Sequence, residues 1–170
     1  MFGMHNQETF LELVKKLFGD SDPNYLIDIL PKTSESRTWF QVEEYFLSSL
    51  WEEIWKKHIY IILKIFSYYE FELYLYQSNY FTSTDLGDRV LDIFDKKIEH
   101  DTIAETVEIM RYALCNMNIL LYIYLPEIKS LISKSDSDFI YLNLYGFQEE
   151  TDVQLLKEIA LSEGMFLRKV

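Results

Sequence analysis

Five acidic residues recur at helical spacing between residues 85 and 99, and this is the most regular arrangement of chemically active groups in the sequence. They are Asp85, Asp88, Asp92, Asp95 and Glu99, separated by alternating steps of three and four residues. At about 100° per residue, these positions fall within an arc of roughly 80° on a helix. Such a row of carboxylates would imitate nucleic-acid phosphates and bind a basic groove. It would equally suit an ordinary solvated helix face, so both interpretations stay open.

Tyrosines form a second group of candidate contact residues. They are Tyr68, Tyr69, Tyr74 and Tyr76, which precede the acidic row in the sequence. Tyrosine and tryptophan dominate the binding energy of many protein interfaces. We therefore predict that these tyrosines anchor a protein partner whose position the acidic row sets by charge.

Catalytic and metal-binding patterns are weak in this chain. The three histidines, His5, His58 and His100, are scattered, and neither a glycine-rich phosphate loop nor a Gly-x-Ser-x-Gly segment occurs. Cys115 is the single cysteine and stands among apolar neighbours, so we expect it to be buried. The sequence therefore predicts no catalytic residue, no metal site and no cofactor. An enzyme with an unrecognised carboxylate site is left as an alternative.

The composition is that of a folded acidic domain. Of the 170 residues, 49% are hydrophobic, and 28 acids against 16 bases give a formal net charge of −12. That charge would repel the phosphates of nucleic acids and anionic membranes, and it favours a basic protein partner. One cysteine excludes a disulfide within the chain, and the first ten residues do not resemble a secretory signal. We expect a single domain over residues 1–170, located in the cytoplasm.

The aromatic stretch from His58 to Phe81 raises the question of a membrane span. A spanning helix needs about 20 consecutive apolar residues, and charged residues from Lys64 onward interrupt this stretch. Isoleucines and aromatic residues alternate over 59–66 and again over 71–76, which is typical of strands. We therefore predict a β-hairpin made of these two segments.

Helical and strand patterns alternate along the rest of the chain. Helices are predicted over residues 6–20, 39–57, 85–99, 103–118, 126–135 and 151–164, and strands over 24–30, 119–125, 138–147 and 165–170. Three helix starts have a capping-box spacing, at Thr38, Thr102 and Thr151. We predict an α+β fold: one mixed sheet of about five strands that contains the hairpin and is covered by about five helices.

Function is predicted from charge and aromatic content together. The leading hypothesis is an acidic protein-binding module, such as an inhibitor or immunity-type antitoxin that neutralises a basic toxin or nuclease. A structural or regulatory module that forms a homodimer through an aromatic sheet face is the alternative. An enzyme is the second alternative, and it would need a cleft with convergent titratable groups.

Overall fold

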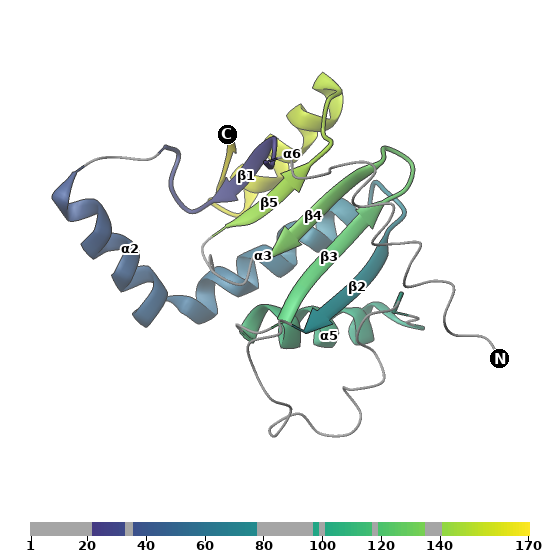
Figure 1. Ribbon diagram of the computed structural model, residues 1–170, viewed down its shortest axis with the longest axis horizontal. Coiled ribbons are helices and arrows are strands. Elements are labelled where there is room, and N and C mark those ends of the chain that lie inside the picture. Colours follow the sequence, from purple (N-terminus) through teal and green to yellow (C-terminus); the bar gives the residue numbers. More distant parts are fainter. Residues whose placement is uncertain (1–21, 33–35, 78–96, 99–100, 117–118, 135–140) are drawn as a thin grey trace.

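A computed structural model of the chain describes residues 22–32, 36–77, 97–98, 101–116, 119–134 and 141–170 (Figure 1). These residues form four helices and six strands. The helices are α2 (Arg37–Ser49), α3 (Trp51–Phe66), α5 (Ile103–Cys115) and α6 (Glu150–Ser162). The strands are β1 (Tyr25–Asp28), β2 (Glu72–Gln77), β3 (Ile119–Leu125), β4 (Ser130–Lys134), β5 (Leu142–Tyr145) and β6 (Phe166–Lys169). The predicted α+β class is confirmed, and the predicted element counts are close.

The six strands form one sheet in the order β2-β3-β4-β5-β1-β6. Every neighbouring pair of these strands runs antiparallel, so the prediction of a mixed sheet is wrong within the described residues. The C-terminal strand β6 forms one edge of this sheet. The sheet does contain a hairpin, but β3 and β4 form it through the turn from Pro126 to Lys129.

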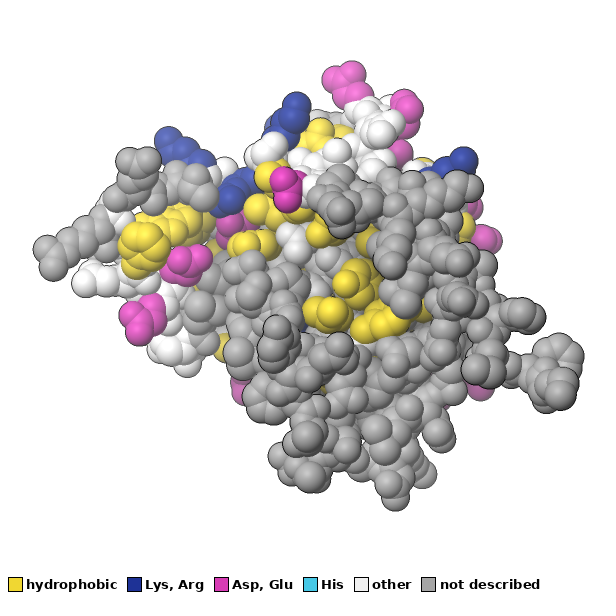
Figure 2. Space-filling view, in the orientation of Figure 1, with side chains coloured by type: hydrophobic (Ala, Val, Ile, Leu, Met, Phe, Trp, Pro, Cys, Tyr) yellow, Lys and Arg dark blue, Asp and Glu magenta, His cyan; other side chains and the backbone are white. Residues whose placement is uncertain are grey.

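Helices α3, α5 and α6 cover one face of the sheet (Figure 1). The main core lies between these helices and the strands. Side chains alternate between the two faces of a strand, so Leu73 and Leu75 of β2 are fully buried in the main core while Tyr74 and Tyr76 belong to the other face. Tyrosines of β2, β3 and β5 gather around Leu131 on that second face. Figure 2 shows this side of the molecule, with hydrophobic side chains over the middle of the sheet.

The hairpin predicted over 59–66 and 71–76 is wrong in its first segment, because that segment belongs to α3. The buried residues of α3 recur every three or four positions from Ile54 to Ile65, which is the spacing of one helix face. Isoleucine favours strands by local preference, and packing of α3 on the sheet overrides that preference. No helix among the described residues has the length and apolar character needed to cross a bilayer.

Two other predicted helices also differ from the structure. The helix predicted over 39–57 is interrupted at Leu50, where φ is −120° and ψ is 16°, and this break separates α2 from α3. Ser36 rather than Thr38 supplies the side-chain cap of α2. Within the segment 126–135, predicted to be helical, residues 126–129 form a turn and residues 130–134 form β4. All five residues of β4 are buried, and the strand pairs with both β3 and β5.

Most of the remaining elements agree with their predictions. Strands occur within 24–30, 119–125, 138–147 and 165–170, one helix occurs within 103–118, and α6 begins one residue before the helix predicted over 151–164. Thr102 caps α5 as predicted, because its hydroxyl oxygen accepts a hydrogen bond from the Glu105 amide at 3.2 Å. Thr151 does not cap α6, since the N-cap residue is Glu149 and it makes no side-chain cap bond. The helix predicted over 6–20 lies outside the described residues.

Lys134 is a buried lysine that joins β4 to the end of α5. The residue is only 3% exposed. Its Nζ atom donates to the carbonyl oxygens of Ala113 and Asn116, each at 2.6 Å, and of Leu114 at 3.3 Å. The last carbonyl groups of a helix lack partners within the helix and carry partial negative charge. The ammonium group therefore satisfies these acceptors and compensates their charge.

Candidate protein-contact site

The chain turns sharply where α3 ends, and this turn displays two of the predicted tyrosines. The amides of Tyr68 and Tyr69 both donate to the carbonyl oxygen of Ile65, at 3.0 and 3.1 Å. The Ser67 hydroxyl donates to the carbonyl oxygen of Leu63 at 3.2 Å. These bonds close the last turn of the helix. They leave Tyr68 61% exposed and Tyr69 half-buried.

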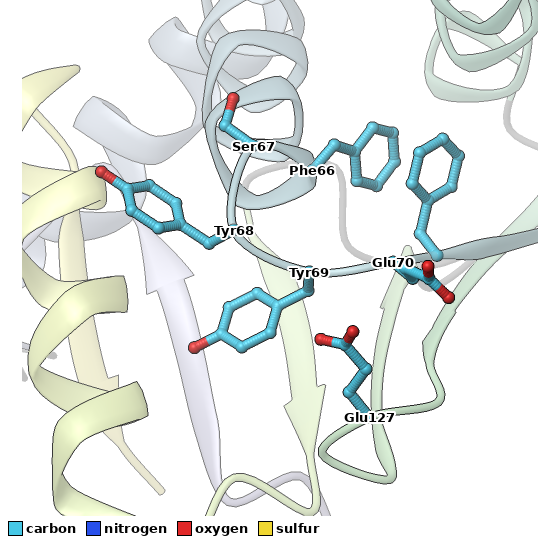
Figure 3. A pocket seen from close by; sticks show the side chains of 7 residues that line it. Phe66, Ser67, Tyr68, Tyr69, Glu70 and Glu127 are labelled. Carbon is cyan, nitrogen blue, oxygen red and sulfur yellow. The ribbon is translucent and has the colours of Figure 1, made fainter.

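A surface hollow of about 520 Å³ lies beside this turn, and we call it the Tyr68 hollow. It is lined by Phe66, Ser67, Tyr68, Tyr69, Glu70, Phe71 and Glu127. The rings of Phe66 and Phe71 stack with their centroids 3.5 Å apart, so the turn is held by an apolar contact. Figure 3 shows the carboxylates of Glu70 and Glu127 on the same side of the turn, with Tyr69 beside Glu127.

Tyr69 connects the hollow to the start of α6. Its hydroxyl group donates to Oδ1 of Asp152 at 2.6 Å. Burial of the phenol raises the pKa of Tyr69 well above its ordinary value, and the hydrogen bond to Asp152 and the negative charges of Asp152 and Glu127 raise it further. The phenol is therefore protonated at neutral pH and acts as a hydrogen-bond donor, not as a base. It holds the turn in place.

A second hollow of about 280 Å³ adjoins the first and shares Glu127 with it. It is lined by Glu127, Ile128, Lys129, Ser130, Gly146, Gln148, Glu149 and Asp152. The hairpin turn and the start of α6 meet here, and the first turn of α6 carries two acids, Glu150 and Asp152. Carboxylates are stabilised at this end of a helix by its dipole. The two hollows together carry four carboxylates against one lysine.

This arrangement is suited to binding a cation that a protein surface presents. Among the ion pairs between described residues, none involves Glu70, Glu127 or Glu149. A lysine or arginine of a partner can therefore reach these carboxylates without displacing an existing cation. Tyr68 adds an exposed aromatic ring beside them, and such a ring attracts both apolar groups and cations.

The structure divides the predicted contact residues into separate groups. Tyr68 and Tyr69 lie together at the hollow, whereas Tyr74 and Tyr76 lie on the second face of the sheet. Tyr74 is only 6% exposed, and its hydroxyl group donates to Glu72 at 2.8 Å. Tyr76 is half-buried and makes an edge-to-face contact with Tyr122. The predicted tyrosines therefore do not form one continuous anchor surface.

The acidic row lies outside the described residues. This applies to Asp85, Asp88, Asp92, Asp95 and Glu99. Lys97, between the last two of these acids, forms an isolated antiparallel bridge with Tyr74, so the helix predicted over 85–99 is wrong at that position. Nζ of Lys97 also contacts Glu72 at 3.0 Å. Residue 97 is therefore fastened to the edge strand β2.

The prediction that Cys115 is buried is wrong, because its side chain is exposed at the end of α5. It lines a cleft of about 350 Å³ with Trp51, Glu52, Trp55, Lys56 and Arg111. Desolvation of the sulfur raises the pKa of the thiol, and the positive charges of Arg111 and Lys134 oppose this effect only in part. The thiol is therefore mainly protonated at neutral pH and is a weak nucleophile. No group of three metal-ligating side chains occurs among the described residues.

Sequence reasoning missed Glu127, Glu149 and Asp152 as parts of the candidate site. Glu127 follows a proline after an apolar run, a pattern shared by a helix start and a hairpin turn. The contact between Tyr69 and Asp152 joins residues that are far apart in the chain, so no local spacing could indicate it.

Comparison of the chain with protein-family models, curated proteins and solved structures found no match. Its function must therefore be inferred from its own residues.

Proposed function

We propose that this chain is an acidic protein-binding module that neutralises a basic partner, in the manner of an inhibitor or an immunity-type antitoxin. The observation that carries the proposal is the Tyr68 hollow, where an exposed tyrosine stands beside the carboxylates of Glu70 and Glu127. A basic nuclease or similar toxin presents lysine and arginine side chains around its substrate groove. Those side chains are the natural ligands of such a hollow.

Charge supports the proposal both during the approach of a partner and at contact. The net charge of −12 accelerates encounter with a cationic protein over distances up to about the Debye length, roughly 10 Å at 0.1 M salt. At contact, close charge pairs across an interface couple by about 1.5–7 kcal/mol. The proposal also assigns contact roles to the five acids Asp85, Asp88, Asp92, Asp95 and Glu99, on the strength of their spacing in the sequence.

Binding rather than catalysis is proposed, because the hollow's titratable group with a shifted pKa, Tyr69, is held protonated by burial and by Asp152. A protonated phenol that is already hydrogen-bonded to a carboxylate is a positioning group. A cytoplasmic location is part of the proposal, since the single cysteine cannot form a disulfide within the chain. The partner would be a protein of opposite charge.

Affinity capture with charge variants tests the proposal. The immobilised chain is exposed to an extract of its native cell at about 0.1 M and at about 1 M salt, where the Debye length falls from about 10 Å to about 3 Å. The same capture is made with the double variant Glu70→Lys/Glu127→Lys. Glu158→Lys, which changes an exposed acid of α6 away from the hollow, is the control.

We expect the wild-type chain and the Glu158→Lys variant to retain the same basic protein at the lower salt concentration. The double variant should lose it, and the wild-type chain should release it at the higher salt concentration. Circular dichroism checks that each variant is folded. Retention of a partner by the double variant at the wild-type level would refute the role of the hollow. A partner of neutral or acidic character would refute the electrostatic basis of the proposal.

A further inference from the structure

Helix α2 stands apart from the rest of the fold. It extends away from the sheet on the left of Figure 1, and its contacts with other elements are concentrated on α3. No described side chain of α2 belongs to the main core or packs against it. A surface helix normally gains its stability by burying an apolar face against the body of the protein. Within the described residues, α2 lacks that support.

Large apolar side chains are nevertheless exposed on α2, and they point to different sides of the helix. Phe40 is 69% exposed and Tyr45 is 58% exposed, and Val42 is also exposed. Figure 2 shows hydrophobic side chains at this end of the molecule with acidic side chains next to them. An isolated helix of about 12–15 residues is only marginally stable in water, and α2 has 13 residues. This helix therefore has the character of an arm that packs against a partner.

A matching surface exists on the outer side of α3. Tyr60 is 51% exposed there. Lys56 and Lys57 precede it by four and three residues, so both lie next to it on the helix. On α2, Glu43 and Glu44 follow Phe40 by three and four residues and flank it in the same way. One helix thus presents an aromatic ring with two acids, and the other presents an aromatic ring with two bases, of which Lys56 also contacts the exposed Glu53 of its own helix at 3.6 Å.

The order of these residues matches an antiparallel pairing. When Phe40 of one chain lies opposite Tyr60 of a second chain, Glu43 lies opposite Lys57 and Glu44 opposite Lys56. In each of these pairs, the two residues are the same number of positions from Leu50, the residue at which α2 and α3 are separated. A two-fold axis beside Leu50 therefore generates both copies of the contact at once. Such a self-complementary interface is the usual one in symmetric dimers.

We propose that α2 is a dimerisation arm, which packs antiparallel along α3 of a second copy of this chain while the second copy's α2 packs along α3 of the first. The lengths agree, because 13 and 16 residues of helix span about 20 and 24 Å. The occupant is a second copy, since the bases that complement Glu43 and Glu44 occur on this chain at the required register. The pairing uses a different surface from the Tyr68 hollow and does not depend on the function proposed for it.

A charge-swap experiment tests the pairing directly. One variant carries Glu43→Lys and Glu44→Lys, and the other carries Lys56→Glu and Lys57→Glu. Each variant alone places like charges opposite each other at both copies of the contact. Mixed together, the two variants form a pair in which every one of these contacts again joins opposite charges. Sedimentation velocity at about 0.15 M salt, where charges more than about 8 Å apart are largely screened, measures the mass of each sample.

The wild-type chain should be dimeric at micromolar concentration, each variant alone should dimerise at least tenfold more weakly, and the mixture should recover the dimer. Phe40→Ala should weaken dimerisation similarly, whereas Tyr68→Ala, which removes another exposed ring away from α2, should leave it unchanged. Circular dichroism confirms that every variant retains its helices. A wild-type chain that is monomeric up to about 0.1 mM would overturn the proposal. A charge variant that dimerises on its own as strongly as the wild-type chain, or a mixture that stays monomeric, would overturn it as well.

Discussion

Replacing the buried Lys134 with methionine should lower the free energy of unfolding by about 2–3 kcal/mol. The ammonium group donates to three carbonyl oxygens at the end of α5, and each buried acceptor left without a donor costs about 1–3 kcal/mol. Two of these acceptors keep a weaker partner: Ala113 accepts from the Asn116 amide at 3.4 Å, and Asn116 accepts from the Ile119 amide at 3.3 Å. The loss of stability should therefore be smaller than the full penalty for three acceptors without a donor.

Two further effects change the expected destabilisation of the Lys134→Met variant in opposite directions. Loss of the positive charge at the end of α5 adds about 0.3–1 kcal/mol, and up to about 2 kcal/mol where the site is partly buried. Methionine, however, has no charge to desolvate, and this offsets part of the loss. The net destabilisation of about 2–3 kcal/mol corresponds to a melting temperature lower by roughly 4–12 °C for a chain of this size.

Urea unfolding followed by circular dichroism measures the effect. Lys157→Met is the control, because Lys157 is an exposed lysine of α6 and its replacement should change the free energy of unfolding by less than about 0.5 kcal/mol. A Lys134→Met variant as stable as this control would refute the capping role. Loss of stability with an unchanged dependence on urea concentration would show that the unfolding reaction itself is the same.

Further predictions concern the site, the helix caps and the core. Tyr69→Phe should lower the free energy of unfolding by about 1.5 kcal/mol. Burial and a carboxylate raise the pKa of Tyr69 above 10.0. The stabilisation by the Tyr69 hydroxyl group is therefore complete below that pH and is lost only as the pH rises through the folded-state pKa. Urea unfolding at about pH 6 and about pH 9 should therefore give the same difference, and a smaller one at pH 9 would contradict this. Thr102→Ala should cost about 1 kcal/mol by removing the α5 cap, whereas Thr151→Ala should cost nothing measurable in the same assay. Ile61→Ala and Ile62→Ala, adjacent in the core, should each cost about 2–5 kcal/mol, and a loss below about 1 kcal/mol for either would argue against the packing of α3.

Sequence reasoning succeeded where a local pattern has one physical solution. The run from Ile119 to Leu125 is followed by a proline and forms the mostly buried strand β3, which is paired on both sides. Thr102 and Glu105 have the spacing of a capped helix start, and the cap is present. In such segments, local preference and tertiary packing favour the same structure, so the sequence suffices.

Predictions failed where local preference and packing disagree. The isoleucines between Trp51 and Phe66 favour a strand locally, yet their three- and four-residue spacing buries one helix face against the sheet. The turn before Ser130 begins with a proline and resembles a helix start. The residues after it are nevertheless more stable as strand β4, because β4 pairs with two neighbouring strands. Only the position of these segments in the assembled sheet distinguishes the two outcomes.

The candidate site could be predicted only in part. Tyr68 and Tyr69 were expected to contact a partner from their residue type, and they line the hollow. Glu127 and Asp152 join them through contacts between distant parts of the chain, and no spacing in the sequence encodes such contacts. The same limit applies to Lys134, which a sequence pattern would assign to solvent and the structure buries.

The most direct test of the proposed function is the dissociation constant of the captured basic partner. Titration calorimetry measures it over a range of salt concentrations for the wild-type chain and for the Glu70→Lys/Glu127→Lys variant. We predict that the wild-type dissociation constant rises steeply between about 0.1 M and about 1 M salt. The variant should bind at least about tenfold more weakly at the lower salt concentration, a loss of about 1.4 kcal/mol or more. Equal dissociation constants for the two chains, or a wild-type value that does not change with salt, would contradict the assignment of the hollow as an electrostatic contact site.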